Sequence, residues 1–86
     1  MPIISIFFGI KIMINYNDHM PPHIHVEYSG NKALVSIIEA SVMRGKLPRR
    51  QLKMVLAWVE IHRDELMQNW ELAKENLPLH KIDPLC

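Results

Sequence analysis

The stretch that decides the fold is HIHVEYSGNKALVSII, residues 23–38. It contains two runs in which apolar side chains alternate with polar or mixed ones, at His23–Tyr28 and Lys32–Ile38. Ser29-Gly30-Asn31 between them is the kind of turn that joins two antiparallel strands. Because the side chains of a strand alternate between the two faces of a sheet, this stretch predicts a β-hairpin with one apolar face.

Residues upstream of the hairpin show the same strand pattern. The side chains that share the apolar side are Ile10, Ile12, Ile14 and Tyr16. Ile3–Phe8 is a shorter apolar run, and Gly9 between the two runs predicts a bulge or a tight bend. Short connections between consecutive strands favour an antiparallel meander. Residues 1–44 are therefore expected to be mainly β, with three to four strands.

The second half of the chain changes to the helix period over residues 48–76. Apolar side chains recur there in steps of three and four, at Leu52, Leu56, Val59, Leu66, Trp70 and Ala73. Pro48 suits the first helical position because its missing N–H costs nothing there. One uninterrupted helix would run about 40 Å. The alternative is two helices with a break near residues 62–64, where Asp64 would cap the second helix.

These patterns together predict one α+β domain spanning residues 1–86. Its C-terminal helical region is expected to pack on the apolar face of the antiparallel meander, and residues 77–86 are expected to form an irregular tail. With 86 residues and a hydrophobic fraction of 49%, the chain can form one core. A core this small leaves little stability margin, so a homodimer or another bound partner is expected.

Charge and cysteine content indicate where such a protein works. Ten Lys and Arg against nine Asp and Glu give a net charge of +1, so any nucleic-acid binding must come from a local patch. Cys86 is the only cysteine, so no disulfide forms within the chain. The N-terminus lacks the basic region of a signal peptide, and no run approaches the roughly 18 apolar residues that cross a bilayer. We expect a cytoplasmic protein without a membrane segment.

Three of the five histidines lie within Asp18-His19-Met20-Pro21-Pro22-His23-Ile24-His25. Imidazoles exchange protons near neutral pH and bind transition metals. Strand alternation places His23, His25 and Glu27 on the face opposite Ile24. The candidate catalytic residues are Asp18, His19, His23 and His25, either as an acid–base set or as metal ligands. The plain alternative is that a sheet with one wet face carries polar side chains there in any case.

A second candidate feature is a basic segment over residues 44–53. Its cationic residues, the candidate nucleic-acid contacts, are Arg44, Lys46, Arg49, Arg50 and Lys53. Arg49 and Arg50 fall in the first predicted helical turn, where the helix dipole disfavours cations. Positive charge at that place favours an anionic partner such as a phosphate backbone. The alternative is an ordinary solvated loop.

Several of these stretches together resemble a family of small bacterial proteins. They are Pro2-Ile3-Ile4-Ser5, Phe8-Gly9-Ile10, the Asp18–His25 run, Gly45-Lys46-Leu47-Pro48, Trp58, Asp64-Glu65-Leu66, Asn69-Trp70 and Ile82-Asp83-Pro84-Leu85. The family is known as domain of unknown function 4160 and carries no established activity. The resemblance implies a two-gene arrangement of the toxin–antitoxin type, with an antitoxin-like partner encoded by the neighbouring gene.

Three functions remain open at this point. The first is a toxin-like protein that acts on RNA, with His23 and His25 as base and acid, His19 as a substitute for either, and an arginine over the phosphate. The second is a non-enzymatic module that binds nucleic acid or a partner protein. The third is a metal-binding protein or metallohydrolase with ligands from His19, His23 and His25, joined by Asp18 or Glu27.

Overall fold

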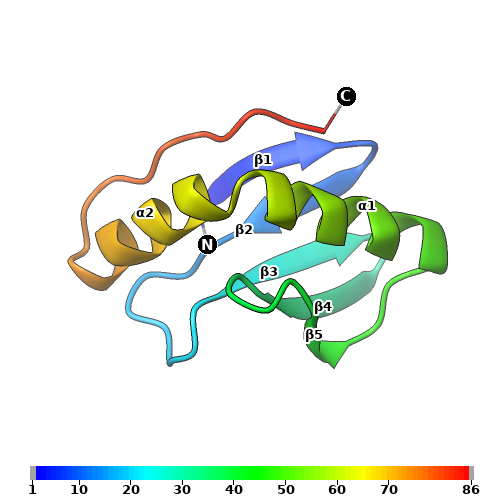
Figure 1. Ribbon diagram of the computed structural model, residues 1–86, viewed down its shortest axis with the longest axis horizontal. Helices are drawn as coiled ribbons and strands as arrows, with labels where there is room; N and C mark the ends of the chain where they lie inside the picture. Colours follow the sequence, from blue (N-terminus) through cyan, green and yellow to red (C-terminus); the bar gives the residue numbers. More distant parts are fainter. Residues whose placement is uncertain (1, 86) are drawn as a thin grey trace.

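The computed structural model describes residues 2–85. Five strands form one antiparallel sheet in chain order, and two helices follow (Figure 1). The strands are β1 (Ile3–Phe7), β2 (Ile10–Met13), β3 (His23–Tyr28), β4 (Asn31–Ser36) and β5 (Val42–Gly45), and the helices are α1 (Arg49–Ile61) and α2 (Arg63–Lys74). The predicted α+β class and the antiparallel meander are confirmed.

The sheet contains one strand more than the three to four that the sequence predicts. All four residues of β5 are exposed, so no apolar alternation marks this strand. β5 pairs with β4 through Ala33↔Gly45, Leu34↔Arg44 and Val35↔Val42. A Cβ atom at Gly45 would overlap the backbone carbonyl of Lys32, so the two strands approach closely only because this residue is glycine.

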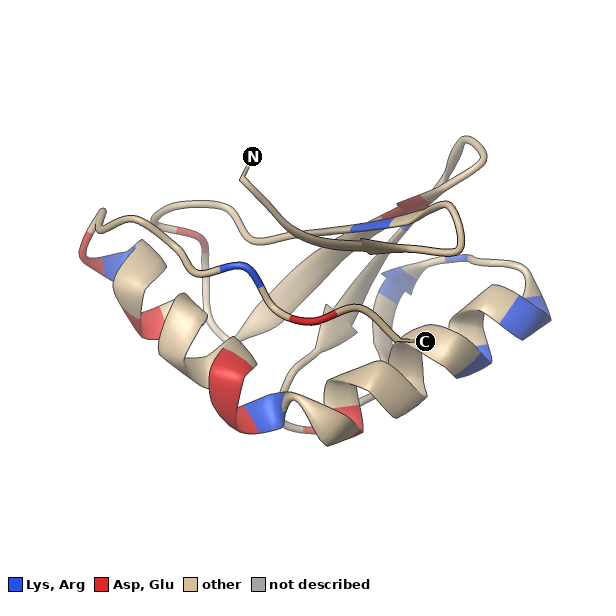
Figure 2. Ribbon diagram, turned by 90° about the horizontal axis from the view of Figure 1, so that it is seen from above, with Lys and Arg blue, Asp and Glu red and all other residues tan. Residues whose placement is uncertain are grey.

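The two helices cover one face of the sheet, as the two views in Figures 1 and 2 show. The register aligns Ile12, Val26 and Ala33 across neighbouring strands, and all three side chains are buried in this covered face. The helices contribute Val55, Trp58, Val59, Leu66, Trp70 and Ala73 to the same core. Tyr16 was expected on the apolar side, but β2 ends at Met13, and Tyr16 lies in the following turn with 41% of its surface exposed.

The helical region is divided at His62. α1 ends at Ile61 and α2 begins at Arg63, so of the two alternatives the structure has two helices. The prediction that Asp64 caps the second helix is wrong, because His62 occupies the capping position and Asp64 lies in the first turn of α2. A carboxylate in that turn is still favoured by the helix dipole. Pro48 takes the capping position of α1 and therefore lies immediately before the first helical residue.

Residues 77–85 contain no helix or strand, yet they are bound to the rest of the protein. The backbone N–H of Ile82 donates to the carbonyl of Ile4 at 2.9 Å, and the Ile82 side chain is buried in the core. The buried Asn69 side chain donates to the carbonyl of His80 at 2.8 Å and accepts its N–H at 2.9 Å. This segment therefore closes the core beside β1 (Figure 1).

The structure tests only part of the expectation of a cytoplasmic protein without a membrane segment. Among residues 2–85, neither helix is long and apolar enough to cross a membrane. Cys86, the single cysteine that supports the expectation of a cytoplasmic protein, lies outside the described residues. The cytoplasmic location therefore stays a prediction.

Candidate functional site

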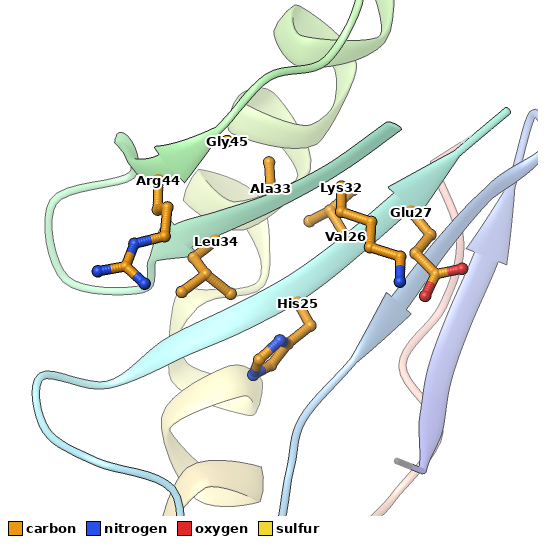
Figure 3. Close-up of a pocket in the computed structure, with 8 residues that line it drawn as sticks. All are labelled: His25, Val26, Glu27, Lys32, Ala33, Leu34, Arg44 and Gly45. Carbon is orange, nitrogen blue, oxygen red and sulfur yellow. The ribbon is translucent and has the colours of Figure 1, made fainter. Parts of the chain in front are cut away.

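The face of the sheet opposite the helices carries two rows of aligned side chains. The register gives the rows Met13–His25–Leu34–Arg44 and Lys11–Glu27–Lys32. Figure 3 shows His25, Leu34 and Arg44 on neighbouring strands of this open face. The strand pairing itself thus places an imidazole from the histidine-rich run in the same row as a guanidinium from the basic segment, with Leu34 between them.

The loop over residues 14–22 brings Asp18 to the end of this face. Asn17 adopts a left-handed backbone conformation with a φ of 54°. Its backbone N–H donates to the carbonyl of Ala73 at 3.2 Å, and its side-chain amide donates to Oδ1 of Asn76 at 3.1 Å. Because these contacts tie the loop to the end of α2, the position of Asp18 depends on the tertiary fold.

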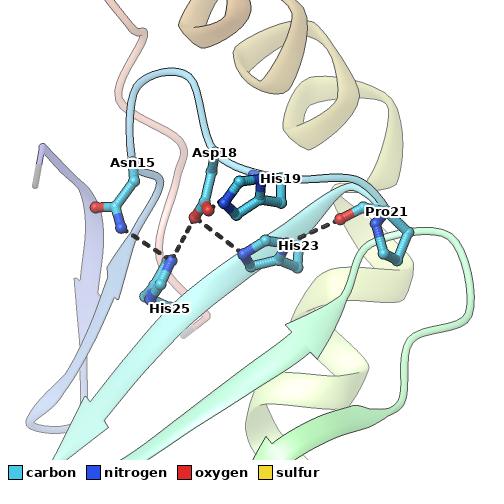
Figure 4. A network of polar contacts seen from close by, with 6 residues as sticks. All are labelled: Asn15, Asp18, His19, Pro21, His23 and His25. Carbon is cyan, nitrogen blue, oxygen red and sulfur yellow. Dashed lines mark hydrogen bonds and ion pairs between the residues drawn. The ribbon is translucent and has the colours of Figure 1, made fainter.

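Asp18 lies between two histidines of β3 (Figure 4). Its Oδ2 is 3.0 Å from Nε2 of His23 and 2.8 Å from Nε2 of His25. Its other oxygen, Oδ1, accepts the backbone N–H of His19 at 2.8 Å. The exposed fractions of the side chains are 17% for Asp18, 6% for His23 and 21% for His25. We call these three side chains the Asp–His cluster, and their polar atoms converge on one point largely withdrawn from water.

The ring of His23 is held on two sides. Its Nδ1 lies 2.8 Å from the carbonyl oxygen of Pro21, and because a carbonyl only accepts, Nδ1 carries a proton. The ring also packs against Trp70 of α2, with 5.3 Å between ring centroids. On the other side of the cluster, Nδ2 of Asn15 lies 3.1 Å from Nε2 of His25. The orientation of the cluster is therefore fixed by groups outside it.

The pKa of Asp18 lies below its usual value. Partial burial by itself would raise this pKa. That effect is outweighed by the hydrogen bond with His25, the backbone hydrogen bond from His19 and the charge interactions with His23 and His25. The carboxylate is consequently ionised at neutral pH, where it can serve as a base, an ion-pair partner or a metal ligand.

A hollow of about 360 Å³ opens beside the cluster. Its lining residues are Asp18, His19, Met20, His23, His25, Leu34, Met43 and Arg44. A neighbouring hollow of about 240 Å³ shares three of these residues, His25, Leu34 and Arg44, and extends towards Glu27 and Lys32 (Figure 3). We call the two hollows together the open-face trough. A ligand in this trough would meet the Asp–His cluster and Arg44 at once.

The structure brings together only part of the predicted site residues. Asp18, His23 and His25 converge, and Arg44 lines the same hollow. His19 also lines the hollow, but its ring is exposed and does not join the cluster. The remaining basic residues lie apart: Lys46 is exposed after β5, while Arg49, Arg50 and Lys53 line a separate hollow on α1 with Met54.

Sequence reasoning missed four contributors to the site: Asn15, Met20, Leu34 and Met43. The hairpin turn does carry a signal for Leu34, because a turn at Ser29 and Gly30 pairs this residue with His25. Neither Asn15 nor Met43 has such a signal. Asn15 belongs to the loop before β3, and Met43 belongs to the strand that apolar alternation does not reveal.

The fold and the site define a small α+β protein with an Asp–His cluster on the open face of its sheet. Residues 9–71 match the family described as Domain of unknown function (DUF4160), and the chain belongs to this family. The match covers the loop, β3, β4 and β5, and therefore the whole Asp–His cluster and Arg44. No curated protein and no solved structure matches the chain.

Proposed function

We propose that this protein is the toxin-like component of a two-gene bacterial module and that it acts on RNA in the open-face trough. The observation that carries the proposal is that Arg44 lines the same hollow as Asp18, His23 and His25. Reaction at a phosphodiester needs groups that move protons and a cation that stabilises charge on the phosphate. This hollow offers an ionised carboxylate, two imidazoles and a guanidinium.

The two histidines of the cluster are suited to different tasks. His25 is the more exposed of the two, and its ring lies in the row with Leu34 and Arg44. His23 is nearly buried, and both of its ring nitrogens already face a polar partner, Pro21 on one side and Asp18 on the other. This arrangement favours His25 as the histidine nearer to the substrate, while His23 has no ring nitrogen free to reach it.

The charge distribution supports a phosphate-bearing substrate. None of the five basic side chains of residues 44–53 forms an ion pair within residues 2–85. Figure 2 shows Lys and Arg on β5 and on the first half of α1, whereas acidic residues recur along α2. A polyanion is thus attracted to the end of the molecule that holds Arg44, despite the small net charge.

A partner encoded by the neighbouring gene would act by covering the trough. Apolar side chains stand exposed at its rim, Met20 with 67% and Met43 with 41% of their surface accessible. Flexible methionine side chains adapt to an apolar partner surface and lose exposed area when covered. The same contact would block access of RNA to His25 and Arg44.

Expression of the chain alone, and together with the product of the neighbouring gene, tests the proposal. We expect growth arrest with loss of intact RNA for the chain alone, and normal growth for the pair. Arg44→Gln should abolish the arrest, while Arg50→Gln, the same change of charge in a separate hollow, should not. Normal growth with abundant folded wild-type chain, or arrest that does not depend on Arg44, would contradict the proposal.

A non-enzymatic nucleic-acid-binding module is the second candidate. It is favoured by the hollow of Arg49, Arg50 and Lys53, which lies apart from the Asp–His cluster. Such a module would bind RNA or DNA with an affinity that falls steeply as salt rises and would leave the strand intact. Substitution of His25 would then leave binding unchanged.

A further inference from the structure

We infer that Oδ2 of Asp18, Nε2 of His23 and Nε2 of His25 bind one divalent transition-metal ion. As a statement about how the site acts on RNA, this inference rests on the proposed function. As a statement about metal binding, it stands on the geometry of the three side chains alone.

The three donor atoms have the spacing that a metal site needs. They all lie within 4.8 Å of one another. Donor atoms around a tetrahedral Zn²⁺ with bonds near 2.1 Å lie about 3.4 Å apart. Oδ2 of Asp18 is 3.0 and 2.8 Å from the two histidine nitrogens, so small side-chain rotations suffice to admit an ion. Two imidazoles and one carboxylate suit Zn²⁺, Co²⁺ or Fe²⁺ better than Mg²⁺, which prefers oxygen ligands.

The hydrogen-bonding pattern leaves a place for a cation. Because Nδ1 of His23 donates to Pro21, Nε2 of the neutral ring carries a lone pair, and this lone pair faces the ionised Oδ2 of Asp18. Nε2 of His25 faces the donor Nδ2 of Asn15 and the acceptor Oδ2 of Asp18 at once, and one ring nitrogen cannot serve both. An ion among the three atoms replaces repulsion between lone pairs by coordinate bonds. The competing explanation is that both histidines are doubly protonated, so that their ring protons, in place of an ion, remove the repulsion between the lone pairs.

The groups around the ligands are those that orient metal-binding side chains. A metal-bound histidine usually donates its second ring N–H to a carbonyl or a carboxylate. His23 makes this contact with Pro21, and Trp70 packs against its ring. The second oxygen of Asp18 accepts the N–H of His19, which leaves Oδ2 directed at the histidines. Two of the three ligands are thus oriented by contacts that do not involve the metal.

The protein supplies three ligands, and the hollow of about 360 Å³ lies beside them. Three protein ligands with an open position are typical of catalytic zinc sites, whereas structural sites are closed by four. The open position would take water or a phosphate oxygen of the substrate. Arg44 lines the same hollow and supplies a cation for the phosphates of the bound strand.

Metal titration of the tag-free, chelator-treated protein tests the inference without any activity assay. We expect one Co²⁺ per chain, with the visible absorption of a coordinated ion, displaced by one equivalent of Zn²⁺. Asp18→Asn and His25→Gln should each weaken binding by more than the roughly 10–100-fold that loss of an outer partner costs. The matched control is His62→Gln, because His62 pairs with Glu65 at 2.6 Å but lies outside the three-ligand group.

Two results would overturn the metal site. One is that the wild type binds the metal no more tightly than His25→Gln does. The other is that His62→Gln loses as much metal affinity as His25→Gln. Circular dichroism confirms that each variant is folded, and the two separate ligand variants keep the test valid if one of them unfolds. Metal binding without any action on RNA would contradict the proposed function and leave the metal site standing. RNA cleavage by chelator-treated, metal-free protein would support the proposed function and contradict a part for the bound ion in the reaction.

Discussion

Replacement of Gly45 by alanine tests whether β5 is what places Arg44 at the site. Gly45 has a φ of +85°, and a Cβ atom there would overlap the carbonyl oxygen of Lys32 on β4. Gly30 has the same φ of +85° but no atom within 4 Å of the position of its Cβ. Gly30→Ala therefore serves as a control for the backbone conformation alone.

The magnitudes of the two substitutions can be separated. The left-handed conformation costs a non-glycine residue about 1–2 kcal/mol, and this cost is common to Gly30→Ala and Gly45→Ala. At Gly45 the overlap also forces β5 away from β4, with the loss of about two hydrogen bonds at about 1 kcal/mol each. A domain of this size loses roughly 4–8 °C of melting temperature per kcal/mol, so Gly45→Ala should melt roughly 8–16 °C below Gly30→Ala.

Thermal melts followed by circular dichroism measure this difference. At temperatures at which the Gly45→Ala variant is still folded, it should also bind RNA in the trough more weakly than the wild type, because Arg44 moves with β5. Gly30→Ala should leave RNA binding unchanged, since the 29–30 turn lies at the other end of β3 from the cluster. Equal melting temperatures for the two variants would refute the argument that close approach of β5 to β4 positions Arg44.

Three further predictions concern the rest of the structure. In the metal-free protein, the lowered pKa of Asp18 contributes stability that is full at pH values above the ordinary pKa of aspartate and is lost as pH falls through the pKa of the folded state. The urea concentration at the unfolding midpoint should therefore decrease once the pH is lowered beyond about 4. This decrease should be smaller in Asp18→Asn. Asn69→Ala should cost about 2–3 kcal/mol in urea unfolding, because two hydrogen bonds to His80 are lost, whereas the exposed Gln68→Ala should cost little. If the basic residues of α1 contact phosphates, Lys53→Gln should reduce the salt slope of RNA binding by about one; an unchanged slope would place RNA elsewhere.

The hairpin of residues 23–38 was predictable because its turn residues and the alternation of its apolar side chains indicate the same strand pairing. The alternating side chains and the turn at Ser29 and Gly30 select one register, and a shift by one residue would expose Ile24 and bury Glu27. The two histidines of β3 consequently fall on the same parity whatever the rest of the fold does.

The remainder of the site depends on contacts between distant parts of the chain. Asp18 reaches the histidines because Asn17 is bound to the end of α2, and no local pattern encodes that contact. Arg44 joins them only through pairing of β5 with β4, which is a property of backbone hydrogen bonds and of Gly45. Composition and spacing identified these residues separately, and the tertiary structure was needed to place them together.

The helix break shows the same division between local and tertiary information. The sequence pattern left one helix or two helices open and located the break within residues 62–64. The choice of His62 over Asp64 as the capping residue coincides with a tertiary contact, in which the Nε of Arg63 donates to the carbonyl of Ile37 at 3.1 Å. Cap preference alone favours aspartate, and the contact of Arg63 with the turn after β4 accompanies the earlier start of α2.

Cleavage of a single-stranded RNA oligonucleotide by purified, partner-free protein loaded in turn with Zn²⁺, Co²⁺ and Mn²⁺ is the most direct test of the account. The wild type should cleave the strand with at least one of these ions, and a chelator should stop the reaction. Arg44→Gln should lower the rate by roughly 100–1,000-fold, the usual loss for one group that stabilises developing charge, while Arg50→Gln should lower it little. RNA that stays intact with folded, metal-loaded wild type, or equal rates for the two arginine variants, would contradict the account.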